Sequence, residues 1–206
     1  MNLPNKITLS RIFLVPIFMV FIIPLPYWVI NSSYLSLIHP QMVEINRFIM
    51  HYGNYIGAII FIIAASTDKV DGYLARKRNM ITKFGIFLDP IADKLLITAA
   101  LIGLVQRNQV TGWAAMIIIA REFIVTGFRL VAAGEKIVLP AGNWGKIKMV
   151  AQSIAIAITL LKDYPFSIIT NIPIDRYAMS IAVIITIYSG YDFLKKNKDI
   201  IINGQM

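Results

Sequence analysis

Four aspartates in this chain of 206 residues have a spacing that could support metal-ion chemistry. Asp68 and Asp71 are three residues apart, and Asp89 and Asp93 are four apart, so each pair shares one face of a helix. A charged group inside a membrane segment costs about 2.5–3.5 kcal/mol on insertion scales. Four neighbouring carboxylates also repel one another unless protons or a cation lie among them. Carboxylate oxygens without histidine or cysteine favour magnesium, manganese or calcium over zinc.

Two other interpretations of the aspartates stay open from the residues alone. The carboxylates could form interfacial ion pairs with neighbouring basic residues such as Lys69, Lys94 and Arg76. They could instead form the ion site of a divalent-cation transporter. Arg76 favours an enzyme, because it is placed to meet an anionic ligand beside a metal, and a transporter has no obvious use for it. Transporters also often contain two related halves, whereas this chain has one acidic cluster.

The composition places the aspartates in a membrane protein. Hydrophobic residues make up 57% of the chain and charged residues 15%, against about 45–50% and about 25% in soluble domains. The mean hydropathy is +0.68. These values exclude a soluble domain, a disordered chain and a fibrous repeat. The net charge of +9 fits anionic lipid headgroups better than nucleic acid, since the basic residues are spread along the chain.

Six apolar stretches are candidates for helices that cross the ~30 Å hydrocarbon core. They are residues 12–30, 55–74, 84–105, 113–133, 149–161 and 177–193. The fifth is expected to begin near Trp144, and residues 2–11 predict a short interfacial helix before the first. With both termini in the cytoplasm, the loops on that side receive most of the lysines and arginines. We expect one all-α membrane domain over residues 1–206, with six transmembrane helices and both termini cytoplasmic.

A second group of charged residues lies in and after the fourth segment. Lys146 and Lys148 would lie near the cytoplasmic end of the bundle, and Arg121 can add a guanidinium fork. Such a site suits an alcohol that carries its own phosphate. The lysines could instead be ordinary cytoplasmic anchors, and Arg121 could form an ion pair with Glu122 inside the membrane.

The spacing around the aspartates resembles the signature of the CDP-alcohol phosphatidyltransferases, D-x2-D-G-x2-A-R-x8-G-x3-D-x3-D. All eight fixed positions are present, as Asp68, Asp71, Gly72, Ala75, Arg76, Gly85, Asp89 and Asp93. The resemblance implies a six-helix membrane enzyme that displaces CMP from a CDP-linked lipid with an alcohol.

The same resemblance implies a role for each residue of the signature. The ligands of divalent magnesium or manganese, with two ions expected, would be Asp68, Asp71, Asp89 and Asp93. Asp93 would also act as the general base for the incoming hydroxyl. The residues that contact the CDP moiety would include Asp68, Gly72 and Arg76.

Residues outside the signature resemble the branch of that family that makes phosphatidylglycerophosphate. They are Asn5, Thr8 and Arg11 near the start, and the order Arg121, Glu122, Arg129, Gly145, Lys146, Lys148. The resemblance implies CDP-diacylglycerol and glycerol 3-phosphate as substrates, with Asn5 and Thr8 at the CDP-lipid. The acceptor phosphate would be bound by Arg11, Arg121, Lys146 and Lys148. Inositol phosphate, serine or phosphatidylglycerol as the acceptor is the nearest alternative.

The expected location is the cell membrane, as a multi-pass protein whose active site faces the cytoplasm. A homodimer is expected from the family. Small residues at Gly57, Ala64, Gly103 and Gly127 could pack either against a second copy or within the bundle.

Overall fold

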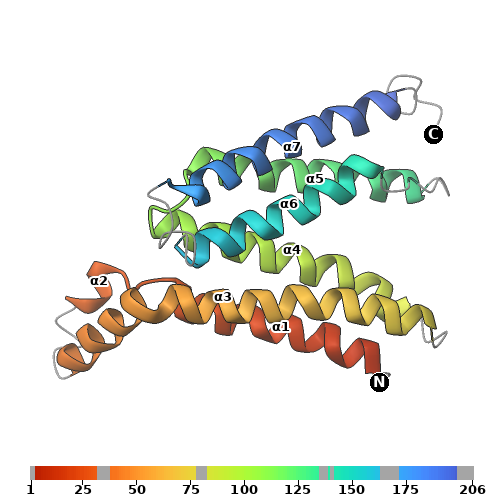
Figure 1. Ribbon diagram of the computed structural model, residues 1–206. Coiled ribbons are helices and arrows are strands. Elements are labelled where there is room, and N and C mark those ends of the chain that lie inside the picture. Colours follow the sequence, from red (N-terminus) through yellow and green to blue (C-terminus); the bar gives the residue numbers. More distant parts are fainter. Residues whose placement is uncertain are drawn as a thin grey trace.

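A computed structural model describes residues 3–31, 38–77, 83–134, 139, 142–162 and 172–198, and throughout these ranges the regular structure is helical. The helices are α1 (Leu3–Ile22), α2 (Tyr27–Ile30), α3 (His39–Lys77), α4 (Lys83–Gln106), α5 (Gly112–Gly134), α6 (Asn143–Leu160) and α7 (Ile174–Lys196). The six long ones run roughly side by side along one bundle (Figure 1). The expectation of an all-α protein is confirmed for the described residues.

Two parts of the described chain are long and apolar enough to cross a membrane, namely His39–Thr67 in α3 and all of α7. The apolar helix Thr8–Ile22 is shorter. Many large apolar side chains are also exposed on the outside of the bundle, among them Phe13, Leu130 and Ile184. Exposed apolar surface on this scale is costly in water and favourable in lipid. The fold is therefore consistent with a membrane protein.

The long helices form two groups of three. α1 packs closely on α3 and α4, whereas α7 packs on α5 and α6 (Figure 1). The first group is centred on fully buried side chains such as Phe18, Phe61 and Leu101. Fewer contacts join the groups, and these run from α3 to α6 and from α4 to α5 and α6. The interior between the groups is therefore where a site could form.

Small residues allow the close approach of α1, α3 and α4. A Cβ atom on Gly53 would lie 2.1 Å from the carbonyl oxygen of Phe21, and one on Gly103 would lie 2.5 Å from the side chain of Ile22. Gly57 likewise meets α1, and Ala64 is fully buried. Three of the four small residues considered for a dimer face thus pack inside the bundle.

The N-terminal region differs from the sequence-based expectation. The interfacial helix predicted for residues 2–11 is continuous with the first apolar segment in α1. That segment was expected to reach residue 30, but α1 ends at Ile22 and α2 is separate. Pro24 and Pro26 explain the break, because proline lacks an N–H donor and disfavours a helical residue before it. The Leu25 N–H donates instead to Oδ1 of Asn46 on α3, at 2.9 Å.

Arg107 holds the far end of the first group together. Directly after α4, its Nε donates to the carbonyl of Ile22 and its Nη2 to that of Ile49, both at 2.6 Å. A further bond of 3.3 Å reaches the carbonyl of Phe21. Burial lowers the pKa of Arg107 from its ordinary value through desolvation. One guanidinium thus links the end of α1, the first third of α3 and the end of α4.

Candidate functional site

The four predicted aspartates occupy the two helices on either side of residues 78–82. Asp68 and Asp71 lie in the last turns of α3, and Asp89 and Asp93 lie in the first half of α4. These parts of α3 and α4 belong to the end of the bundle where α1 begins and α7 ends, called here the termini end (Figure 1). The backbone therefore brings both pairs to one end of the molecule.

Among these four, the structure describes the side chain of Asp93. Those of Asp68, Asp71 and Asp89 lie outside the described part, as do those of Gly72, Arg76 and Asn5. The side chains that are described contain no cluster of three or more potential metal ligands. The four-carboxylate metal site accordingly stays a prediction.

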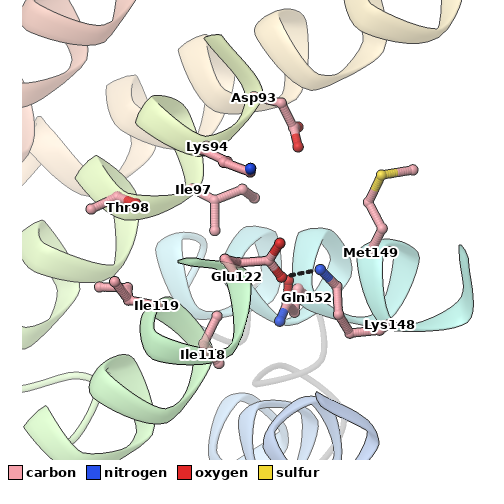
Figure 2. A pocket seen from close by; sticks show the side chains of 10 residues that line it. All are labelled: Asp93, Lys94, Ile97, Thr98, Ile118, Ile119, Glu122, Lys148, Met149 and Gln152. Carbon is pink, nitrogen blue, oxygen red and sulfur yellow. Dashed lines mark hydrogen bonds and ion pairs between the residues drawn. The ribbon is translucent and has the colours of Figure 1, made fainter. Parts of the chain in front are cut away.

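Asp93 lies on the wall of a cavity between α4, α5 and α6. This space, called here the central cavity, has a volume of about 260 Å³. Its lining consists of Asp93, Lys94, Arg121, Glu122, Val125, Thr126, Arg129, Gly145, Lys146, Lys148 and Met149. A narrower recess continues from it toward Ile97, Ile118 and Gln152. Figure 2 shows the Asp93 carboxylate on the α4 side of the recess, facing the side chains of Glu122 and Lys148.

Glu122 is the centre of the polar contacts in this cavity. Lys148, which is 5% exposed, donates a hydrogen bond from Nζ to Oε1 of Glu122 (Figure 2). Arg121 Nη1 lies 3.6 Å from the same oxygen. A buried ammonium requires a partner, and the carboxylate supplies it. The ion pair between Arg121 and Glu122 considered from the sequence is therefore present, and Lys148 takes part in it.

Lys94 adds a further positive charge that the sequence-based list of site residues did not include. Its Nζ donates to the hydroxyl of Thr126, and that hydroxyl donates to the backbone carbonyl of Glu122 at 2.7 Å. The sequence contained a signal for it, since Lys94 is a charged residue within an apolar segment and directly follows Asp93.

Arg121 is held in place from the opposite side by α7. Its Nη2 donates to the hydroxyl of Ser189 at 2.7 Å. Ser189 is buried, and the next residue, Gly190, leaves room for the arginine stem. Sequence reasoning missed this contribution, because nothing in the sequence of α7 indicates which residue faces Arg121.

The charges in the central cavity favour an anion. Lysine and arginine contribute five side chains to the lining, against two carboxylates. Arginine binds phosphate oxygens through two parallel N–H groups, whereas lysine acts as a mobile point charge. The cavity can therefore hold a phosphorylated small molecule beside the Asp93 carboxylate.

The structure brings four predicted site residues to this one cavity, namely Asp93, Arg121, Lys146 and Lys148. Thr8 and Arg11 lie on α1 with buried side chains, and neither is part of the described lining of the cavity. Their proposed contacts with the CDP-lipid and the acceptor phosphate stay predictions.

Comparison with known proteins agrees with the signature. The family model for CDP-alcohol phosphatidyltransferase matches residues 1–188. A CDP-diacylglycerol–glycerol-3-phosphate 3-phosphatidyltransferase from Bacillus subtilis is 46% identical over 196 residues, which cover 95% of each chain. A protein of the same name from Rickettsia felis is 34% identical, and the alignment covers 96% of each chain. Another from Haemophilus influenzae is also 34% identical, and the alignment covers 96% of this chain and 94% of that protein. With a family match across most of its length and relatives aligned nearly end to end, this chain belongs to the CDP-alcohol phosphatidyltransferase family.

Proposed function

We propose that this protein transfers the phosphatidyl group of CDP-diacylglycerol to glycerol 3-phosphate, releasing phosphatidylglycerophosphate and CMP. The observation that carries the proposal is the central cavity, where Asp93 of the signature lies beside Arg121, Lys146 and Lys148. Relatives that share nearly the whole chain carry the name of this reaction.

In the proposed reaction, a hydroxyl oxygen of the acceptor forms a bond to the phosphorus that carries the diacylglycerol. The bond from that phosphorus to the bridging oxygen of CMP breaks, and CMP leaves. The hydroxyl proton passes to the carboxylate of Asp93. The Asp93 carboxylate, on α4, faces α5 and α6, which hold the basic residues (Figure 2).

The acceptor phosphate binds on the α5–α6 side of the cavity. Lys148 is already charge-paired with Glu122, while Lys146 is exposed at the start of α6. Arg121 is fixed by Ser189, so its guanidinium is positioned before the acceptor arrives. A serine acceptor would leave these positive charges without a phosphate to bind, which favours a phosphorylated polyol.

Asp68, Asp71, Asp89 and Asp93 would hold two divalent ions, Mg²⁺ or Mn²⁺. The described lining beside Asp93 contains no histidine, so the expected ligands are carboxylate oxygens alone. Such a donor set fits these hard cations. When bound, the ions neutralise charge on the pyrophosphate and on the leaving CMP. Asp68, Gly72 and Arg76 bind the CDP moiety, and Asn5 and Thr8 of α1 approach the same substrate.

The single domain over residues 1–206 crosses the cell membrane with its six long helices and keeps both termini and the cavity at the cytoplasmic face. The common position of the start of α1 and the end of α7 supports an even number of crossings (Figure 1). The exposed glycine Gly127, which has open space beside it, supports a homodimer contact on α5. The transporter alternative loses its support, because the family is one of transferases.

The test is CMP release by the purified protein in detergent with CDP-diacylglycerol and magnesium. Glycerol 3-phosphate, inositol phosphate, serine and phosphatidylglycerol are supplied one at a time. We expect release with glycerol 3-phosphate alone and its loss when EDTA is added. Release with a different acceptor would overturn the acceptor assignment, and release with none of them would overturn the proposed function.

A further inference from the structure

The narrow recess that continues from the central cavity has the size of one small polar group. Its volume is about 20 Å³. One water molecule needs about 10–15 Å³, so the recess can take a single hydroxyl group but not an inositol ring. Ile97, Ile118 and Ile119 give it apolar walls. Thr98 and Gln152 add uncharged polar groups to the same space (Figure 2).

The recess opens beside the proposed general base. Asp93, Glu122 and Lys148 line both the central cavity and the recess. Asp93 lies on α4, whereas Glu122 and Lys148 lie on the α5–α6 side, where the acceptor phosphate is proposed to bind. An acceptor that extends from Asp93 to that side therefore passes the mouth of the recess.

Gln152 is 2% exposed, and α7 fixes the orientation of its amide group. Its Nε2 donates to the hydroxyl of Thr186 at 2.8 Å, and that hydroxyl donates to the carbonyl of Ala182 at 2.6 Å. Because the proton of Thr186 is used on Ala182, this hydroxyl can only accept from Gln152, so the amide nitrogen must face α7. The amide oxygen Oε1 is left as an acceptor without a partner among the described residues.

Thr98 provides a second polar group without a partner. Its hydroxyl makes no hydrogen bond to any described residue. A polar atom in an apolar space is costly unless it is hydrogen-bonded. One acceptor on Gln152 and one hydroxyl on Thr98, in a space for a single oxygen, together fit a hydroxyl group of a bound molecule.

We propose that the recess binds the secondary hydroxyl of glycerol 3-phosphate, which donates its hydrogen bond to Oε1 of Gln152. This inference rests on the proposed function, because it assumes that glycerol 3-phosphate is the acceptor. The secondary hydroxyl is on the middle carbon, between the phosphate and the hydroxyl that gives its proton to Asp93. Its oxygen accepts a hydrogen bond from Thr98, and Thr186 acts as the positioning residue for Gln152.

The experiment compares kcat/KM for glycerol 3-phosphate and for 3-hydroxypropyl phosphate, which lacks only the secondary hydroxyl. The full-length purified protein is used with saturating CDP-diacylglycerol and magnesium. A site that pairs with a substrate hydroxyl rejects an analogue without it, since its own polar groups are then left unpaired. We expect the wild type to prefer glycerol 3-phosphate about tenfold or more.

Gln152→Met keeps the length of the side chain but removes the amide. It should lower the preference to about threefold or less, by reducing kcat/KM for glycerol 3-phosphate while the value for 3-hydroxypropyl phosphate changes little. Thr186→Val, which frees the amide to turn, should lower the preference in the same direction but by less. A merely structural role would reduce both values together and leave their ratio unchanged.

The matched control is Gln109→Met, the same substitution at a position directly after α4. Oε1 of Gln109 accepts a hydrogen bond of 2.9 Å from Asn54, and Gln109 does not line the recess. This variant should keep the wild-type preference, whatever its thermal midpoint.

Two results would overturn the proposal, namely no preference in the wild type, or a preference that both Gln152→Met and Thr186→Val leave intact. The recess would then hold water only. An equal loss of preference in Gln109→Met would also overturn it. If Gln152→Met did not fold, the wild-type preference and Thr186→Val would still decide. If the wild type used neither phosphate, the proposed function itself would be the part that fails.

Discussion

Asp93 is the residue on which the proposed chemistry depends most directly. Asp93→Asn keeps the size of the side chain but removes the base, so we expect kcat to fall about 10²–10⁴-fold. Binding of CDP-diacylglycerol, measured by equilibrium titration, should change little. Turnover at nearly the wild-type rate would show that another group accepts the proton.

Lys146 offers a separate test of the acceptor site. Its side chain is exposed at the start of α6, so Lys146→Ala should leave stability unchanged. Because its contact with the acceptor phosphate exists before the transition state, we expect the acceptor KM to rise about tenfold with kcat within about twofold. An unchanged acceptor KM would mean that Lys146 only anchors the protein at the membrane surface.

The Glu122–Lys148 pair should behave as a unit. Glu122→Gln leaves the buried Lys148 ammonium without its counter-ion, which costs about 3–5 kcal/mol when one partner of a buried pair is removed. Lys148→Met in the same protein should restore part of that stability, as a thermal unfolding cycle in detergent would show. Additive effects of the two substitutions would contradict the pairing.

The individual residues show what a sequence can and cannot predict about this site. The spacing of the aspartates singled out Asp93, and the basic residues in and after the fourth segment singled out Arg121, Lys146 and Lys148. All four line one cavity. The contacts of Lys94 with Thr126 and of Arg121 with Ser189 join residues 32 and 68 positions apart. Such pairs depend on how helices pack, and a pattern within one helix does not contain that information.

At the scale of the elements, the far end of the bundle depends on Arg107. Arg107→Lys keeps the positive charge but loses the planar fork that reaches carbonyls of α1 and α3. We expect a loss of about 2–3 kcal/mol in thermal stability, since hydrogen bonds from charged groups are each worth about 1.5–3 kcal/mol. Arg176→Lys, at an exposed position near the start of α7, is the control and should be neutral. Equal stability of the two variants would show that the fork of Arg107 is dispensable.

The sequence predicted one boundary of the elements correctly and missed another. The start of α6 near Trp144 agrees with the structure, in which α6 begins at Asn143. The end of α1 at Ile22 was missed, because the apolar run continues to residue 30 and hydropathy outweighed Pro24 and Pro26 in the prediction. Pro24 and Pro26 together end α1, whereas the single Pro16 lies within the helix.

At the scale of the whole molecule, the site requires both groups of helices. Asp93 belongs to α4 of the first group, while the basic residues belong to α5 and α6 of the second. The signature and the acceptor residues are thus far apart in the sequence and meet only through the fold (Figure 1).

The absence of cysteine makes the proposed dimer testable at this scale. Gly127→Cys introduces a single thiol on the exposed side of α5. When membranes that contain this variant are treated with an oxidant, the thiol should form a disulfide between two copies. Gly112→Cys, at the far end of α5, should remain monomeric on a non-reducing gel. Monomers alone from Gly127→Cys would contradict a dimer contact on this face.

The central claim is that the protein transfers a phosphatidyl group to glycerol 3-phosphate. Following an isotope label from glycerol 3-phosphate into lipid tests this claim most directly. Purified protein is given labelled glycerol 3-phosphate, CDP-diacylglycerol and magnesium, and label in the organic phase is compared with CMP released. We expect one labelled lipid for each CMP, with both products lost in Asp93→Asn and after chelation of the metal. CMP released while the label stays in the aqueous phase would contradict transfer to this acceptor.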